Sequence, residues 1–238
     1  MHLGNRRLKC YECLTPRRAS IVYDLSCVLR GQGVEMPECV GVQGNLVVSE
    51  WVDGRPLAEI AEAEKIELMA AYQATIHGAA IPARFKRHRA MPHARWLFAR
   101  VRRFGGEAVD DARVVQLRDR LLRARPEGAP WGVLHPDFIT TNLIVADRGV
   151  VSIDNEFLGV GHGQEWDILN TVKVSFPEQS RLQERYLNAY AKHRSLHTLM
   201  SHRNYWEAIY DIKMAGKRLS EGESDAGLRH LQAAAEKA

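Results

Sequence analysis

The stretch VLHPDFITTNLIV, residues 133–145, is the most informative part of this 238-residue chain. It contains the spacing H-x-D-x-x-x-x-N, formed by His135, Asp137 and Asn142, and Asp154 follows twelve positions after Asn142. In phosphoryl transfer, a loop with this spacing brings one carboxylate to a substrate hydroxyl, while the amide and the later carboxylate hold Mg²⁺. Taken singly, each of these residues is also a common turn former.

The surrounding pattern predicts short strands. Apolar runs occupy residues 132–134, 143–145 and 150–153, and the last two are separated by Asp-Arg-Gly at 147–149, a favourable hairpin turn. The loop therefore leads into a hairpin, and Asp154 comes at the end of its second strand. This placement suits oxygen ligands that converge on a hard cation.

The N-terminal part is predicted to be small and rich in strands. Residues 7–11 have the pattern of a strand, and residues 20–29 have apolar residues at helical spacing. A second hairpin is predicted from residues 40–42 and 46–51, because glycine lies in the short loop between them.

The rest of the chain is predicted to be mainly helical, with the hairpin as an insertion. We therefore expect an α+β chain with a small β-rich part at residues 1–50 and a mainly helical part at residues 51–238. The predicted helical segments are residues 57–77, 84–103, 110–125 and 165–238, the last with breaks near Pro177 and Gly222.

Composition excludes several classes of protein. The chain has 45% hydrophobic and 26% charged residues, a balance typical of globular proteins and not of disordered ones. No apolar run reaches the roughly 18 residues of a membrane span, and the N-terminus lacks a signal-like pattern, so we expect a cytoplasmic protein. A net charge of +4 argues against nucleic acid as a partner. The basic residues at 84–103 are interpreted as a solvated helix face or a surface that attracts anions.

Further segments place the chain near a known family. Residues 47–57 read VVSEWVDGRPL, residues 74–77 read ATIH, and Asp167 lies in EWDIL. With the loop and hairpin, these segments resemble the aminoglycoside phosphotransferase and choline kinase-like family, which shares the two-lobed protein-kinase-like fold. The resemblance covers roughly residues 7–170, and its motifs occur in the family's order.

The resemblance implies an ATP-dependent phosphotransferase that acts on a hydroxyl of a small molecule of the aminoglycoside, sugar or amino alcohol class. It makes Asp137 the catalytic base and Asn142 and Asp154 the Mg²⁺ ligands. His135 and Asp167 then have structural roles, in the catalytic loop and in bracing it. The implied nucleotide residues are Lys9 for the phosphates, the backbones of Glu50 and Val52 for the adenine edge, and Ile144 and Ile153 for the apolar floor.

The segment around Lys9 departs from the family. Only eight residues precede Lys9, where the family has two strands and a phosphate-covering loop. The glutamate that pairs with this lysine is missing, and Asp24 is the expected substitute. The departures leave an alternative open, in which the chain is a weak or inactive kinase-like protein that binds a nucleotide or a partner.

Four cysteines lie within the first forty residues, and reduced thiols are the default for a cytoplasmic chain. They also offer four ligands for a tetrahedral zinc site, although the spacing of the second pair departs from that of zinc ribbons. The four are Cys10, Cys13, Cys27 and Cys39.

Overall fold

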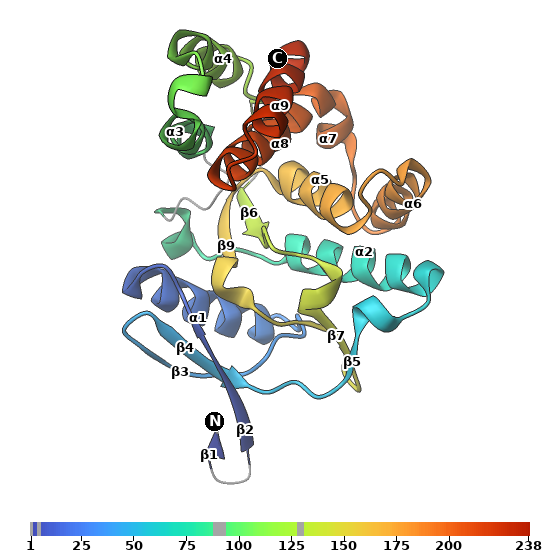
Figure 1. Ribbon diagram of the computed structural model, residues 1–238. Helices are drawn as coiled ribbons and strands as arrows, with labels where there is room; N and C mark the ends of the chain where they lie inside the picture. The colour runs from blue at the N-terminus through green and yellow to red at the C-terminus, as the bar shows by residue number, and fades with distance from the viewer. Residues whose placement is uncertain (1, 4–5, 88–93, 128–130) are drawn as a thin grey trace. The chain divides into compact units, whose positions relative to one another are not determined.

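The computed structural model describes residues 2–3, 6–87, 94–127 and 131–238. Two compact units make up the chain (Figure 1). The first unit contains Met1–Arg89 and Trp131–Ser195, and the second contains Ala90–Pro130 and Leu196–Ala238. Helices combine with small antiparallel sheets, so the predicted α+β class is confirmed. The lobe boundary predicted after residue 50 lies inside the first unit and stays a prediction.

The first unit holds all of the strands in the described ranges. These are β1 (His2–Leu3), β2 (Arg6–Glu12), β3 (Cys39–Gln43), β4 (Leu46–Glu50), β5 (Arg55–Pro56), β6 (Trp131–Leu134), β7 (Leu143–Ala146), β8 (Gly149–Ser152) and β9 (Gly159–His162). Its helices are α1 (Pro16–Gly31), α2 (Glu62–Gly78), α5 (Gln164–Ser175) and α6 (Ser180–Ala191), with short 3₁₀ turns η1 (Leu57–Glu59), η2 (Ala83–Arg87), η4 (Thr140–Asn142) and η5 (Asn155–Phe157).

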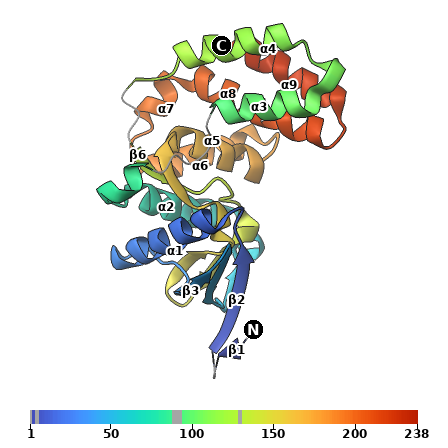
Figure 2. The same ribbon diagram turned by 90° about the vertical axis from the view of Figure 1, so that its left-hand side faces the viewer.

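The first sheet has the strand order β1-β2-β4-β3 and is antiparallel. Helix α1 lies against it, where Ala19 and Val22 are buried with Val47 (Figures 1 and 2). The helix begins four residues before the predicted start, because Thr15 Oγ1 accepts a hydrogen bond from Arg18 N at 3.1 Å and a proline follows Thr15. Proline is favourable at the first helical position, where no amide donor is needed.

The predicted hairpin at residues 143–153 is confirmed as β7 and β8, with Val145 opposite Val150. Strand β5 joins its other side, where Pro56 lies opposite Ile144. A two-residue strand that contains proline has almost no sequence signal, which is why β5 was not predicted. The three strands form one sheet in the order β5-β7-β8.

Strand β9 was not predicted either. It pairs with β6, with Val133 opposite Val160, and its sequence GVGH has too little β propensity to be recognised. The pairing depends on a close approach at Gly132, where a Cβ atom would lie 2.0 Å from Gln164 Nε2. The β6–β9 ladder therefore brings the chain that precedes the predicted catalytic loop, residues 135–142, against the start of α5.

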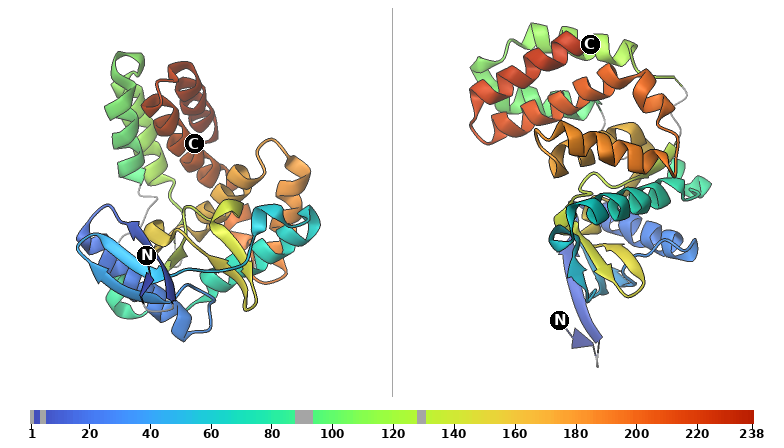
Figure 3. Two further views of the ribbon diagram at one scale, coloured as in Figure 1. Left: turned by 60° about the horizontal axis from the view of Figure 1, so that its bottom comes forward. Right: turned by 90° about the vertical axis from the view of Figure 1, so that its right-hand side faces the viewer.

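Helix α2 packs beside α6 (Figure 3). Eight of its residues are buried. The predicted helix at residues 57–77 is two elements, because Ile60 and Ala61 have extended or near-extended backbone dihedrals between η1 and α2. Glu62 and Glu64 in the first turn of α2 stabilise its positive N-terminal end.

The second unit is helical throughout its described part. Helices α8 and α9 run side by side, and α3 packs on α8 and α4 (Figure 2). The basic residues 84–103 fall partly on η2 and α3, and residues 88–93 lie outside the described residues. In the described ranges, no helix combines the length and the apolar character needed to cross a membrane. The elements are α3 (Ala94–Gly105), η3 (Gly106–Ala108), α4 (Asp111–Arg123), α7 (His197–Ser201), α8 (Arg203–Ser220) and α9 (Ser224–Lys237).

Candidate active site

A cavity of about 430 Å³, part of it open to solvent, lies in the first unit. Its lining includes all five residues that the sequence predicts for the nucleotide, together with one predicted metal ligand. These residues are Lys9, Glu50, Val52, Ile144, Ile153 and Asp154. Tyr11, two positions after Lys9 on β2, and Trp51 also line the cavity, and sequence reasoning did not assign them a role.

Lys9 forms an ion pair with Asp154, and both residues line the cavity. Both side chains are partly buried. The prediction that Asp24 pairs with Lys9 is therefore wrong. Asp24 is exposed, because Val22 and Leu25 occupy the face of α1 that packs inward.

Asp137 and Asn142 form one hydrogen-bonded unit. Asn142 Nδ2 donates to Asp137 Oδ2 at 2.8 Å and to the Asp137 carbonyl at 3.1 Å. The Asn142 carbonyl in turn accepts from Ile153 N at 2.8 Å, so the catalytic loop is tied to the residue that precedes Asp154. Because the amide nitrogen of Asn142 is used in this way, its amide oxygen is the atom left to ligate a cation.

Asp154 has a left-handed backbone, with φ 57° and ψ 54°. Asp154 and the following turn η5 are together called the Asp154 loop, residues 154–157. Left-handed geometry is uncommon for residues other than glycine, although aspartate tolerates it better than most. The surrounding contacts must therefore hold this turn.

Glu156 is a further acidic residue of the site that the sequence reasoning missed. Burial raises the pKa of its carboxyl, and the nearby carboxylates of Asp154 and Asp137 raise it further. Its Oε2 atom is buried and has no hydrogen-bond partner among the described residues. The signal in the sequence was a second acid two positions after Asp154, in DNE.

The donor set fits a hard divalent cation. Carboxylate oxygens of Asp154 and Glu156 and the amide oxygen of Asn142 are the ligand types that Mg²⁺ prefers, and Mg²⁺ keeps several waters or phosphate oxygens besides. The unpartnered Oε2 of Glu156 is an acceptor that a cation or its water would satisfy.

The side chain of Asp167 anchors the predicted catalytic loop. It is fully buried, and its Oδ2 accepts from His135 N at 2.8 Å and contacts His77 Nε2 at 3.0 Å. His135 Nε2 lies 2.9 Å from Asn155 Oδ1, which connects the loop to η5. This is the bracing contact that the sequence predicts for Asp167, and His77 and His135 act as its structural partners.

The side chain of Glu50 is held by several donors. Its Oε1 accepts from Glu38 N at 3.0 Å and from Arg148 Nη2 at 2.9 Å, and Arg30 Nη1 lies 3.5 Å away. Burial alone raises the pKa of Glu50, but these partners outweigh it and hold the pKa below its ordinary value. The carboxylate is thus occupied structurally, and the Glu50 amide is occupied as well, since it donates to the Glu38 carbonyl at 2.8 Å.

The cysteines do not form a metal site in the structure. All four are free, and Cys13 is the buried one. Across the described ranges, no group of three or more His, Cys, Asp or Glu side chains is arranged to hold a metal ion. The structure therefore gives the zinc alternative no support.

Known structures of small-molecule kinases share this fold. The choline kinase LicA from Streptococcus pneumoniae aligns with a TM-score of 0.64 and 15% sequence identity, over 99% of this chain and 87% of that chain. An ethanolamine kinase from Plasmodium vivax aligns with a TM-score of 0.67 and 14% identity, over 96% and 74%. The amicoumacin kinase hAmiN, solved with AMP-PNP, Ca²⁺ and Ami, aligns with a TM-score of 0.70 and 14% identity, over 97% and 81%. The predicted kinase-like fold is confirmed.

A comparison at the level of sequence families identifies the chain directly. No curated protein matches it. The model of the phosphotransferase enzyme family, however, matches residues 8–202, which include most of β2, the H-x-D-x-x-x-x-N loop and the Asp154 loop. The chain therefore belongs to the phosphotransferase enzyme family, as its sequence predicted.

Proposed function

We propose that the chain transfers the γ-phosphoryl group of ATP to a hydroxyl of a small molecule of the aminoglycoside, sugar or amino alcohol class, in the cytoplasm and with Mg²⁺. The observation that carries the proposal is a chain of contacts that connects Asp137 to the cavity. Asp137 and Asn142 are hydrogen-bonded to each other, Asn142 is bonded to Ile153, and the next residue, Asp154, lines the same cavity as Lys9.

The nucleotide occupies this cavity in the proposal. The Lys9 ammonium binds the phosphates, since a compact positive charge is suited to them. The base lies against the backbone of Glu50 and Val52, with Ile144 and Ile153 as its apolar floor. Val52 follows the end of β4, so its amide is free of the β2–β4 ladder.

Asp137 acts as the base. The substrate oxygen forms a bond to the γ-phosphorus, the bond from that phosphorus to the bridging oxygen breaks, and ADP leaves with the electron pair. The hydroxyl proton passes to the Asp137 carboxylate. Asn142 Nδ2 holds Oδ2 of Asp137 at 2.8 Å, so Oδ1 is the oxygen that remains to accept this proton.

Asn142 and Asp154 are the proposed Mg²⁺ ligands, and Glu156 follows Asp154 by two positions in the same loop. When bound, Mg²⁺ neutralises the negative charge that develops on the phosphate oxygens. The two ligands come from the end of η4 and from the residues after β8, and the bond from Ile153 N to the Asn142 carbonyl keeps these segments adjacent.

Calorimetry of ATP binding tests the proposal. ATP is titrated into the wild type with and without Mg²⁺, and the titration is repeated for Asp154→Ala. Asp147→Ala serves as the matched control, because Asp147 is an exposed carboxylate in the β7–β8 turn of the same hairpin. Binding that requires Mg²⁺, is lost in Asp154→Ala and persists in Asp147→Ala is the expected result.

A screen for ATP consumption with alcohol-bearing compounds follows the binding measurement. Acceptor-dependent formation of ADP identifies the enzyme. Binding of Mg²⁺ and ATP without turnover for any acceptor favours the nucleotide-binding alternative. A wild type that binds no ATP in the presence of Mg²⁺ contradicts the proposed function.

A further inference from the structure

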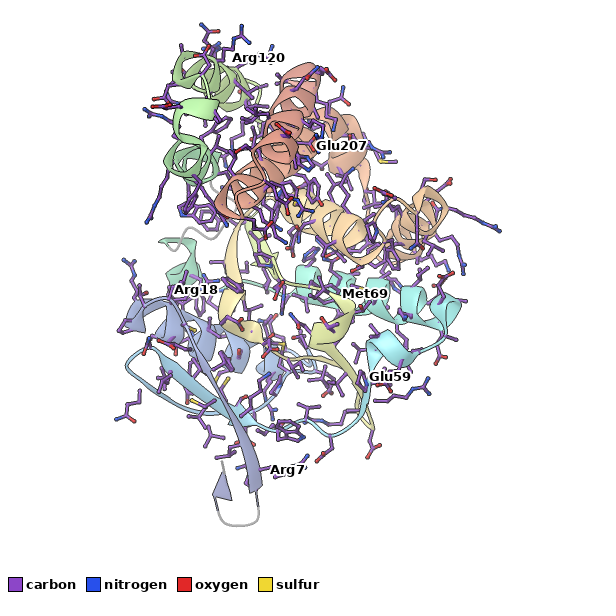
Figure 4. All side chains as sticks on the ribbon, in the orientation of Figure 1. Arg7, Arg18, Glu59, Met69, Arg120 and Glu207 are labelled. Carbon is purple, nitrogen blue, oxygen red and sulfur yellow. The ribbon has the colours of Figure 1, made fainter. Side chains whose placement is uncertain are left out.

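Arg18 connects α1 to the Asp154 loop. Its Nε donates a hydrogen bond of 3.1 Å to the carbonyl oxygen of Glu156, 138 positions further along the chain. Arg18 lies in the first turn of α1 (Figure 4), and α1 contacts η5 directly. One long side chain thus joins the N-terminal end of this helix to the loop that carries two of the acidic residues of the site.

The environment of Arg18 keeps its side chain in place. The Arg18 side chain is partly buried where it donates to the Glu156 carbonyl, and the neighbouring Ala19 is fully buried. A buried cation requires partners, and the Glu156 carbonyl is one that a guanidinium can hold in a defined direction. The backbone end is fixed as well, since Arg18 N donates to Thr15 Oγ1.

The Asp154 loop needs such a contact. Asp154 has a left-handed backbone, and a single 3₁₀ turn follows it, closed by Leu158 N donating to the Asn155 carbonyl at 2.9 Å. The loop also carries two carboxylates within three residues, those of Asp154 and Glu156, and like charges so close repel one another. A nearby positive charge offsets part of this repulsion.

We propose that Arg18 is a positioning residue that fixes the Asp154 loop, through the Glu156 carbonyl, in the conformation that binds Mg²⁺ and ATP. The proposal rests on the proposed function of the site. It assigns α1 a second role besides covering the sheet: the helix holds the ligand loop by a side chain that contacts neither the metal nor the substrate. A displacement of the N-terminal turn of α1 moves the Asp154 loop with it.

Three variants test the proposal. Arg18→Met removes the donor and the charge while keeping most of the apolar stem, and Arg18→Lys keeps the charge without the planar donor. Arg17→Met is the matched control, because Arg17 is the adjacent arginine on the same turn and its side chain is exposed. Hydrogen exchange of the amides at residues 155–158 is measured on each unliganded protein. The Mg²⁺ concentration for half-maximal ATP binding is measured by calorimetry.

The expected result has two parts. Exchange at residues 155–158 is faster in Arg18→Met than in the wild type, and the Mg²⁺ requirement rises by about tenfold, the low end of the effect of losing a residue that orients metal ligands. Arg18→Lys falls between Arg18→Met and the wild type in both measurements. A role limited to packing of α1 lowers stability without changing the Mg²⁺ requirement.

Equal exchange rates in Arg18→Met and Arg17→Met, with an unchanged Mg²⁺ requirement, overturn the proposal while leaving the proposed function intact. Failure of the wild type to bind ATP rejects the proposed function. The exchange measurement uses the unliganded protein, so it decides in either case whether Arg18 anchors the loop.

Discussion

Lys9 and Asp154 are partners in an ion pair, although 145 positions separate them in the chain. The pair joins β2 to the Asp154 loop on one wall of the cavity. The same carboxylate is the proposed ligand of Mg²⁺, and the same ammonium is the proposed ligand of the phosphates. When the nucleotide binds, Lys9 must therefore leave Asp154 for the phosphates, and Asp154 must leave Lys9 for Mg²⁺. Lys9 and Mg²⁺ thus compete for the Asp154 carboxylate.

Replacing Lys9 by methionine separates these two effects. We expect Lys9→Met to bind ATP in the presence of Mg²⁺ about 10- to 100-fold more weakly, because a charge-assisted contact to the phosphates is lost. Binding of Mg²⁺ alone is expected to be unchanged or tighter, because Asp154 is freed from its competitor. Calorimetry with each ligand in turn measures both affinities. A parallel loss of both affinities speaks against the competition.

Asp137→Asn is expected to stop turnover without removing the nucleotide. Loss of a general base typically lowers the rate by about 10²- to 10⁴-fold. The asparagine oxygen still accepts the hydrogen bond from Asn142 Nδ2, so the loop keeps its geometry. The comparison requires kcat for an identified acceptor and a binding constant for ATP. Retention of wild-type kcat removes Asp137 from the mechanism.

Asp167→Ala is expected to destabilise the first unit by about 2 to 5 kcal/mol, because two buried partners lose their acceptor. These are the amide of His135 and the ring of His77. Asp167→Asn retains an oxygen for both contacts and is expected to cost less. Urea denaturation of the three proteins gives the free energies of unfolding. Equal stability of Asp167→Ala and the wild type shows that the carboxylate does not support the loop.

Glu50 gives the fold a dependence on pH. Its pKa in the folded state lies below the ordinary value of 4.5, so the charged carboxylate stabilises the fold above pH 4.5, and the contribution is lost as pH falls through the folded-state pKa. Glu50→Gln is therefore expected to be less stable than the wild type at about pH 7, with the difference shrinking as the pH falls through the folded-state pKa of Glu50. Denaturation curves at several pH values measure this difference. A difference that stays constant with pH contradicts the role of Arg148 and Arg30.

Gly227→Ala tests the packing of α9 on α8. An added Cβ would lie 2.6 Å from Leu219 Cγ and 3.4 Å from the carbonyl oxygen of Ala215. Overpacking of this kind costs about 1 to 3 kcal/mol, which exceeds the gain of up to about 1 kcal/mol from the better helix propensity of alanine. Gly31→Ala is the control, since nothing lies within 4 Å of its added Cβ. Thermal unfolding should show a lower Tm for Gly227→Ala alone.

The sequence contained the local elements of the site. Two short apolar runs on either side of the Asp-Arg-Gly segment at 147–149 were enough to predict the β7–β8 hairpin, and the H-x-D-x-x-x-x-N spacing predicted a loop before it. The five nucleotide residues also came from motifs, and they line one cavity. The hairpin prediction succeeded because turn residues and strand pairing act over a few positions, where the backbone itself imposes the geometry. The nucleotide roles of the five residues came from the family resemblance and stay predictions.

Contacts between distant segments were decided by the tertiary structure alone. The lysine partner was predicted to be Asp24 on the next helix, yet the fold brings Asp154 to Lys9. The contact between Arg18 and Glu156 exists only because α1 packs against the Asp154 loop. No pattern in the sequence predicts such contacts, because they depend on how whole helices and strands pack. They also depend on which buried polar groups lie close enough to pair. The sequence determined the chemistry that the site contains, and the packing decided which groups hold it in place.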